Sequence, residues 1–227
     1  MLITMNNSLT NTGRLLAAGL RALLVLTLVT GVVYPLAVTG VAQGLFPGRA
    51  NGSETVADGR VVGSSLIGQS YDLPLKKGRR APEADLKWFQ GRPADGLGTN
   101  SVNTRYRLLV SGATNLSADS AELIQQVEDA RKAVVKDNSV PGYTVAPSDV
   151  PADAVTSSGS GLDPDISPQY ARIQVHRVAA ENGLPVPEVA WLVEKHTEGR
   201  TLGFMGEPRV NVLELNIALS KLVTEGS

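Results

Sequence analysis

One uninterrupted apolar stretch near the N-terminus dominates the hydrophobic pattern of the chain. Residues 22–48 contain no charged side chain, and residues 23–34 are almost entirely apolar. A helix rises about 1.5 Å per residue, so roughly 20 apolar residues cross the hydrocarbon layer of a bilayer. The pattern therefore predicts a transmembrane helix over residues 15–42, preceded by a short N-terminal segment of residues 1–14.

The remaining residues, 43–227, are more polar and are expected to form one soluble domain. Apolar spacing and glycine or proline punctuation predict short strands and several helices. The expected strands lie at residues 63–71 and 210–213. Four helices are expected: one that starts after Asp119 as its cap, one over residues 168–182, one that starts at Pro187 and one over residues 215–223. No alternation of strand and helix typical of a parallel sheet is visible. The predicted fold class is therefore α+β, with a single N-terminal transmembrane helix followed by one α+β domain.

Within this domain the pattern makes four more local predictions. Trp88 and Phe89 are expected in the core, since aromatic residues make up only 4% of the chain, with Arg92 stacked or paired beside them. The first helix is expected to bury the face that carries Ile124, Val127, Arg131, Val134 and Val135. Residues 138–151, with three prolines, are interpreted as a linker, and His176 is expected on an exposed helix face.

The charges around the apolar stretch predict its orientation. Arg14 and Arg21 precede it, and residues 1–42 hold no acidic side chain. An excess of Lys and Arg marks the cytoplasmic end of a membrane helix, so the N-terminus is expected in the cytoplasm and residues 43–227 on the extracytoplasmic (periplasmic) side of a cell inner membrane. A cleaved signal peptide ending near residues 40–42 is the alternative, although this apolar run exceeds the length usual for a signal core.

Small residues in the apolar stretch suggest a neighbour within the membrane. Thr27 and Gly31 lie four residues apart, as do Gly40 and Gly44, and small residues at that spacing let a second helix backbone approach closely. Pro35 is expected to kink the helix. The other interpretation is that Gly and Pro are simply frequent in membrane helices.

Composition and motif searches exclude several functions. The formal net charge is −1, which argues against nucleic-acid binding, and with no Cys and two His neither a disulfide framework nor a metal site is expected. No phosphate-binding glycine motif is present. A hydrolase triad could be drawn from Ser157, Ser158 and Ser160 with His176 or His196. These serines do not stand in the G-x-S-x-G motif of a hydrolase nucleophile, so no catalytic residue is predicted. The residues alone favour a membrane-anchored accessory subunit, with a tethered binding module or hydrolase as the alternative.

Several blocks in the same order resemble the KdpC family, the C subunit of the high-affinity potassium-transporting P-type ATPase complex. The similar blocks are residues 31–46, residues 63–71, W-F-Q-G-R-P at 88–93, S-G-A-T-N-L at 111–116, residues 155–168, and residues 199–219 with L-G-F-M-G-E-P-R-V-N-V-L. The resemblance implies a single-pass subunit beside a channel-like potassium-translocating subunit, a P-type ATPase subunit and a small fourth protein, in a complex that hydrolyses ATP and transports potassium.

The resemblance also implies a catalytic chaperone role, in which the subunit raises the affinity of the ATP-hydrolysing subunit for ATP. Ser111, Gly112 and Asn115 match the family's proposed nucleotide-binding loop, whereas Ala113 replaces its second glycine, and the added Cβ restricts the backbone. With the N-terminus inside, this loop would lie away from cytoplasmic ATP. The alternative is that the domain covers the outer mouth of the channel subunit. Asp163 and Asp165 would then attract cations by their field. The alternative is that this segment simply caps the following helix, with Asp165 or Ser167 as the cap.

Overall fold

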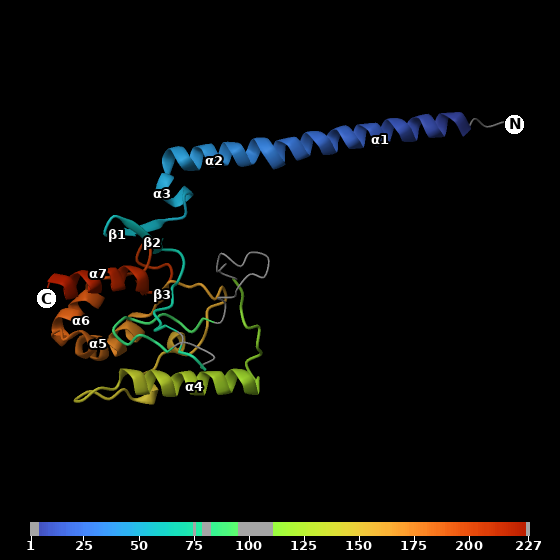
Figure 1. The fold of residues 1–227 in the computed structure, drawn as a ribbon. Helices are drawn as coiled ribbons and strands as arrows, with labels where there is room; N and C mark the ends of the chain where they lie inside the picture. The colour runs from blue at the N-terminus through green and yellow to red at the C-terminus, as the bar shows by residue number, and fades with distance from the viewer. Residues whose placement is uncertain (1–4, 75, 79–82, 95–110, 226–227) are drawn as a thin grey trace. The chain divides into compact units, whose positions relative to one another are not determined.

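The computed structural model describes residues 5–74, 76–78, 83–94 and 111–225 (Figure 1). The chain divides into two compact units, residues 1–54 and residues 55–227. Each unit has its own architecture.

The N-terminal unit is a long apolar helix followed by one short helix. It comprises α1 (Met5–Leu28), a π-helical turn η1 (Val29–Val33), α2 (Tyr34–Leu45) and α3 (Pro47–Ala50). The part from Thr10 to Leu45 is long and apolar enough to cross a membrane, by length and composition, and none of its most apolar window is buried within the chain. The single N-terminal apolar helix predicted from the sequence is confirmed, and it extends past both ends of residues 15–42.

Proline explains the π-helical turn in the middle of this helix. Pro35 has no N–H to donate, and its ring would clash with a carbonyl one turn earlier in a regular α-helix. The preceding Tyr34 N–H instead donates to the carbonyl of Val29, five residues back, which widens the turn. Where the sequence predicted a kink at Pro35, the structure shows a π-helical turn directly before it.

In its described residues the C-terminal unit combines two small sheets with four helices, which confirms an α+β fold. Strands β1 (Glu54–Ala57) and β2 (Arg60–Ser64) form one sheet, and β3 (Asp165–Ile166), β4 (Thr197–Glu198) and β5 (Arg209–Asn211) form an antiparallel sheet in the order β3-β5-β4. The helices are α4 (Ala121–Asn138), α5 (Pro168–Asn182), α6 (Val186–Lys195) and α7 (Val212–Glu225), with short 3₁₀ turns η2 (Pro147–Asp149) and η3 (Ala152–Ala154).

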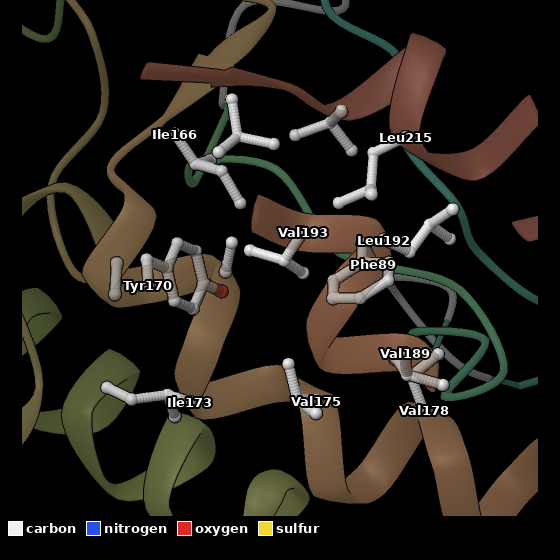
Figure 2. Packing of buried hydrophobic residues seen from close by; sticks show 14 of the residues in the cluster. Phe89, Ile166, Tyr170, Ile173, Val175, Val178, Val189, Leu192, Val193 and Leu215 are labelled. Atoms are coloured by element: carbon white, nitrogen blue, oxygen red, sulfur yellow. The ribbon is translucent and has the colours of Figure 1, made fainter. Parts of the chain in front are cut away.

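The hydrophobic core lies between α5, α6, α7 and the three-stranded sheet. Figure 2 shows Val189, Leu192 and Val193 of α6 facing the same interior as Val178 of α5 and Phe89. Phe89 is fully buried and Trp88 packs against the cluster, as the sequence predicted. The core thus joins the Trp88–Phe89 loop to elements encoded more than 75 residues later.

Helix α5 has the boundaries predicted from the sequence. Its N-cap is Ser167, whose Oγ accepts from Tyr170 N–H at 3.0 Å, and Gly183 ends it in the left-handed conformation at φ +66°. Both ends could be predicted from the nearby sequence. A serine side chain accepts from a free N–H at the start of a helix, and glycine adopts the left-handed conformation that ends one.

The predicted buried face of α4 was wrong at two positions. Ile124 is 49% exposed and Arg131 is exposed, whereas Val134 and Asn138 are buried and Ala130 packs against the core. The N-cap is Ser120, whose Oγ accepts from Leu123 N–H, while Asp119 instead accepts from Ser117 Oγ. The face that packs on the core carries residues 127, 130, 134 and 138. It includes the polar Asn138, which a search for apolar residues at helical spacing does not detect.

Two further interpretations require correction. Residues 138–151 are not a free linker, because Val145 is only 2% exposed and belongs to the core. Helix α7 already begins at Val212, since Asn211 Oδ1 accepts from Glu214 N–H at 3.2 Å and so acts as a helix cap directly after β5.

Candidate functional site

The loop at residues 88–93 is held in place by buried side-chain amides. Asn216 of α7 accepts from Phe89 N–H and donates to Phe89 C=O, each at 2.9 Å. Gln174 of α5 accepts from Gln90 N–H at 2.7 Å and donates to Gln90 C=O at 3.0 Å. Each amide therefore pairs with both polar backbone groups of one loop residue, as a neighbouring β-strand would.

A buried arginine completes this attachment from the other side. Arg177 of α5 is 1% exposed; its Nε donates to Asn138 Oδ1 at 2.8 Å and its Nη2 to Gln174 Oε1 at 2.7 Å. Its Nη1 donates to the carbonyls of Trp88, at 3.0 Å, and Leu86. No carboxylate in the described part of the chain forms a salt bridge with it, and burial lowers the pKa of Arg177 to about 10. At neutral pH it is a buried cation stabilised by neutral acceptors.

Arg92 joins the same loop to the polar segment before α5. Its Nη1 contacts Asp163 Oδ2 at 3.1 Å, and its Nη2 donates to the carbonyls of Ser157 at 3.2 Å and Thr156 at 3.4 Å. The expectation that Arg92 is paired is confirmed, with Asp163 as the partner.

A cavity of about 330 Å³ opens beside these attachments. Its lining is polar at several points and includes Asp137, Tyr170, Arg177, Arg92 and Asp163. Burial raises the pKa of Tyr170 to about 12, so its hydroxyl stays protonated at neutral pH. The charged lining side chains whose contacts are described are bonded within the protein, so the geometry resembles a structural polar core more than a prepared reaction centre.

The two aspartates predicted to attract cations are each paired with an arginine. Asp163 contacts Arg92, and Asp165 Oδ2 contacts Arg209 Nε at 3.2 Å. Burial raises the pKa of Asp165, an effect that Arg209 opposes. This pairing offsets the negative field on which the cation expectation depends, and that expectation stays a prediction. The capping role lies with Ser167, as above.

The residues predicted to bind nucleotide lie together on an exposed segment. Ser111 Oγ and Gly112 N–H both bond to the carbonyl of Ser160, at 3.1 and 2.9 Å. Asn115 adopts a left-handed conformation at φ +52° and its side chain bonds to Ala113 C=O. Helix α4 starts only at Ala121, so this segment is separate from the helix N-terminus, and the Gly112 amide is already engaged.

The serines and histidines considered for a hydrolase have other contacts. Ser158 Oγ and Ser160 Oγ lie 3.3 Å apart and bond to nearby backbone N–H groups. His176 is half-buried and stacks on Tyr143 at 3.8 Å between ring centroids, which corrects its predicted exposed position, and His196 Nδ1 lies 2.9 Å from the Leu192 carbonyl. The histidines are thus engaged away from these serines.

The small residues of the long apolar helix face open space in the isolated chain. A side chain built at Gly31, Gly40 or Gly44 would meet nothing within 4 Å. These glycines lie with Thr27 on the exposed surface of the apolar helix. The surface that small residues leave free is available to another helix.

Sequence reasoning missed the polar residues that position the 88–93 loop. Gln174, Arg177 and Asn216 are each at most 2% exposed. A signal existed in the spacing: Gln174 and Arg177 stand on the helical stripe that contains Ala171 and Val178, and Asn216 lies between Leu215 and Leu219. Polar residues on an otherwise apolar helix face predict buried hydrogen-bonding groups.

Together these features define a chain whose described residues contain one candidate membrane-spanning helix and an α+β domain in which a buried polar network holds the 88–93 loop. The family model "KdpC: K+-transporting ATPase, c chain" matches residues 16–221, which include most of both units. The chain belongs to this family, that of the c chain of the K⁺-transporting ATPase.

Curated relatives support the same family over nearly their whole length. The chain is 75% identical to the potassium-transporting ATPase KdpC subunit of Streptomyces coelicolor over 223 residues, covering 98% of this chain and 99% of the relative. It is 74% identical to the subunit of Streptomyces avermitilis over 219 residues, covering 96% and 99%. It is 46% identical to that of Kineococcus radiotolerans over 215 residues, covering 95% and 97%.

Proposed function

We propose that this chain is an accessory subunit of an ATP-driven potassium uptake pump and that it stabilises the assembled complex. The observation that carries the proposal is the family match over residues 16–221, which includes both the apolar helix and the α+β domain. In this proposal the helix packs through Thr27, Gly31, Gly40 and Gly44 against larger membrane subunits. The partners are a channel-like potassium-translocating subunit, a P-type ATPase subunit and a small fourth subunit.

Co-purification of the unaltered chain in mild detergent tests this proposal. A pump subunit retains larger membrane proteins in constant stoichiometry, and the preparation hydrolyses ATP in response to potassium. A chain that elutes alone from cells expressing the other subunits contradicts the proposal and favours a tethered module unrelated to transport.

The proposal includes an orientation, with the N-terminus in the cytoplasm and the α+β domain outside the cell membrane. Arg14 and Arg21 before the apolar stretch support it. Because the chain has no cysteine, single substitutions provide specific labels. Thr224→Cys is expected to react with an impermeant maleimide in intact cells and Asn11→Cys only after permeabilisation, and the reverse pattern contradicts the orientation.

The finer part of the proposal is that the subunit acts as a catalytic chaperone and raises the ATP affinity of the ATP-hydrolysing subunit. The resemblance of residues 111–116 to the family's nucleotide-binding loop supports it, as does the exposure of Ser111 and Gly112. Binding of a phosphate by the Gly112 amide would require this amide to leave the Ser160 carbonyl.

The apparent KM for ATP of the assembled complex tests this part. Ser111→Ala is expected to raise the KM severalfold with little change in subunit content, whereas Ser117→Ala, on the same exposed segment, is expected to leave it unchanged. Equal KM values for both variants, and no ATP binding by the purified full chain at millimolar nucleotide, would contradict a direct role for Ser111.

A further inference from the structure

The hairpin between β4 and β5 carries an exposed apolar tip, here defined as residues 201–206. Leu202 is 78% exposed, Phe204 is 71% exposed and Met205 is 45% exposed. The chain has only three phenylalanines, and Phe89 by contrast is fully buried. Three large apolar side chains are thus exposed within four consecutive residues of one loop tip, and grouped exposed apolar residues mark candidate interaction sites.

The tip has a defined shape. Thr201 and Met205 exchange backbone hydrogen bonds at 2.9 and 3.0 Å, and Gly203 N–H donates to the Arg200 carbonyl at 3.0 Å. Leu202 has φ +54°, a left-handed conformation that is unfavourable for a branched side chain. A loop that holds Leu202 in this conformation without burying it presents a preorganised surface, which lowers the entropic cost of binding.

The charged residues of the hairpin are paired beneath the tip. Arg200 contacts Glu207 at 2.7 Å, and Arg209 contacts Glu198 at 2.7 Å and Asp165 at 3.2 Å. The tip itself carries no charge, and its base contains no uncompensated basic group of the kind that attracts anionic lipid headgroups. The chemistry favours an apolar protein pocket over a lipid surface.

The short connection between the apolar helix and the domain limits how far the start of the domain can lie from the end of the helix. The helix ends at Leu45 and the domain unit begins at Thr55. An extended chain spans at most about 3.5 Å per residue, so ten residues hold the start of the domain within roughly 35 Å of the helix end. A domain tethered this closely meets proteins in the same membrane at a high effective concentration.

We infer that the apolar tip of the β4–β5 hairpin inserts Leu202, Phe204 and Met205 into an apolar pocket on a larger membrane subunit of the same ATPase. This inference rests on the proposed function, because it requires that the chain assembles with such a subunit. The pocket is expected to be apolar and uncharged at its centre, matching the uncharged tip, with Phe204 as the anchoring side chain.

Photo-cross-linking in the assembled complex tests the inference directly. Phe204 is replaced by the photoreactive p-benzoylphenylalanine in the full chain, and the control places the same group at Ile124, which is 49% exposed on α4. The complex is purified in detergent and irradiated. A covalent adduct to one larger subunit from position 204, at least tenfold above that from position 124, supports the inference. Equal adducts from both positions, or adducts to lipid alone, overturn it.

A second variant pair tests whether the contact contributes to assembly. Phe204→Asp is expected to reduce retention of the chain by the larger subunits at least tenfold, and Ile124→Asp less than twofold, with both full chains unfolding at the temperature of the unaltered chain. Unchanged retention of Phe204→Asp overturns the inference. If the unaltered chain itself fails to co-purify, the proposed function fails as well, so the two failures are distinguishable.

Discussion

Arg177 places a positive charge in the interior, and no carboxylate in the described part of the chain forms a salt bridge with it, although longer-range attraction to Asp137, Glu181 and Asp85 opposes the lowering of its pKa by burial. Four acceptors surround its guanidinium, and two of them are backbone carbonyls of the 86–88 segment. A cation satisfied by neutral groups is costly to bury, yet removing it leaves several buried acceptors without a donor. We therefore interpret Arg177 as the residue that fixes the path of the chain before the 88–93 loop.

Replacing Arg177 tests this interpretation. Arg177→Met is expected to lower the free energy of unfolding by about 3 kcal/mol, because buried acceptors lose their donor. Arg172→Met, which removes an exposed pair with Glu194, is expected to cost less than about 1 kcal/mol. Urea titrations of both full-length variants measure the difference, and equal losses would contradict a structural role for the buried charge.

Tyr170 predicts a pH dependence at the same site. Burial raises the pKa of Tyr170 from 10.0 to about 12, so between these values the folded chain keeps a proton that the unfolded chain has lost. Stability is therefore present below pH 10 and falls as the pH rises toward 12. Arg177, whose pKa is lowered to about 10, acts in the opposite direction, which makes a comparison of variants necessary.

From pH 9 to pH 11 the unaltered chain is expected to lose about 1.4 kcal/mol more stability than Tyr170→Phe. The reason is that pH 11 lies about one unit above the pKa of this tyrosine in the unfolded chain, whereas the folded chain still keeps the proton, and one pH unit corresponds to about 1.4 kcal/mol. Denaturant unfolding at both pH values measures this. An identical pH dependence for the two chains would show that the phenol is not held protonated by burial.

Glycine at position 68 allows a close approach between distant segments. Gly68 N–H donates to the Leu162 carbonyl at 2.8 Å, and a Cβ at this position would lie 2.6 Å from the Asp163 carbonyl oxygen. Gly68→Ala is expected to destabilise the domain by about 1–3 kcal/mol because the backbone must move. Gly159→Ala, where a Cβ meets nothing within 4 Å, is the matched control. Thermal unfolding that ranks the two variants equally would contradict the packing argument.

The sequence predicted part of the residue-scale picture. Trp88 and Phe89 in the core and a partner for Arg92 followed from aromatic scarcity and side-chain chemistry. The identity of that partner, and the reason for Gly68, depend on contacts with residues 162–163. No local pattern near residue 68 or 92 contains this information.

At the level of elements, the domain is organised by helices that hold an irregular loop. Asn216 on α7 and Gln174 on α5 each pair with both backbone groups of a loop residue. The 88–93 segment therefore satisfies its buried polar groups without joining a sheet. The path of this loop is fixed by three buried polar side chains, Asn216, Gln174 and Arg177.

An amide-to-carboxylate change tests the loop attachment. Asn216→Asp replaces the donor toward Phe89 C=O with an acceptor and buries a charge, so it is expected to lower the free energy of unfolding by about 2–3 kcal/mol. Gln126→Glu, on the exposed face of α4, is expected to change it by less than about 0.5 kcal/mol. Chemical denaturation monitored by tryptophan fluorescence suits the test because Trp88 belongs to the loop. Similar values for both variants would contradict the attachment.

Element boundaries were predictable where capping chemistry is local and wrong where tertiary contacts decide. Ser167, Pro168 and Gly183 define α5 correctly from the sequence alone. The face of α4 was misassigned because Asn138 is buried to serve Arg177, and the start of α7 was missed because Asn211 belongs to β5 and also caps the helix. Both errors come from polar residues: Asn138 bonds to a residue far away in the sequence, and Asn211 serves both as a strand residue and as a helix cap.

For the whole molecule, the proposed subunit role requires that the apolar helix remains in the bilayer and that the α+β domain folds as a separate unit. The helix was predictable because length and apolarity alone decide whether a segment can span a membrane. We expect the chain to contact larger subunits through two surfaces. One is the helix surface beside the glycines, where no other part of the chain packs, and the other is the apolar hairpin tip.

Alkaline carbonate extraction of membranes that contain the full chain tests directly whether the apolar helix anchors the protein. A spanning helix resists this treatment, so the intact polypeptide, identified by its mass, is expected to stay in the membrane pellet. Recovery of the intact polypeptide in the carbonate supernatant would contradict membrane anchoring and the subunit role built on it.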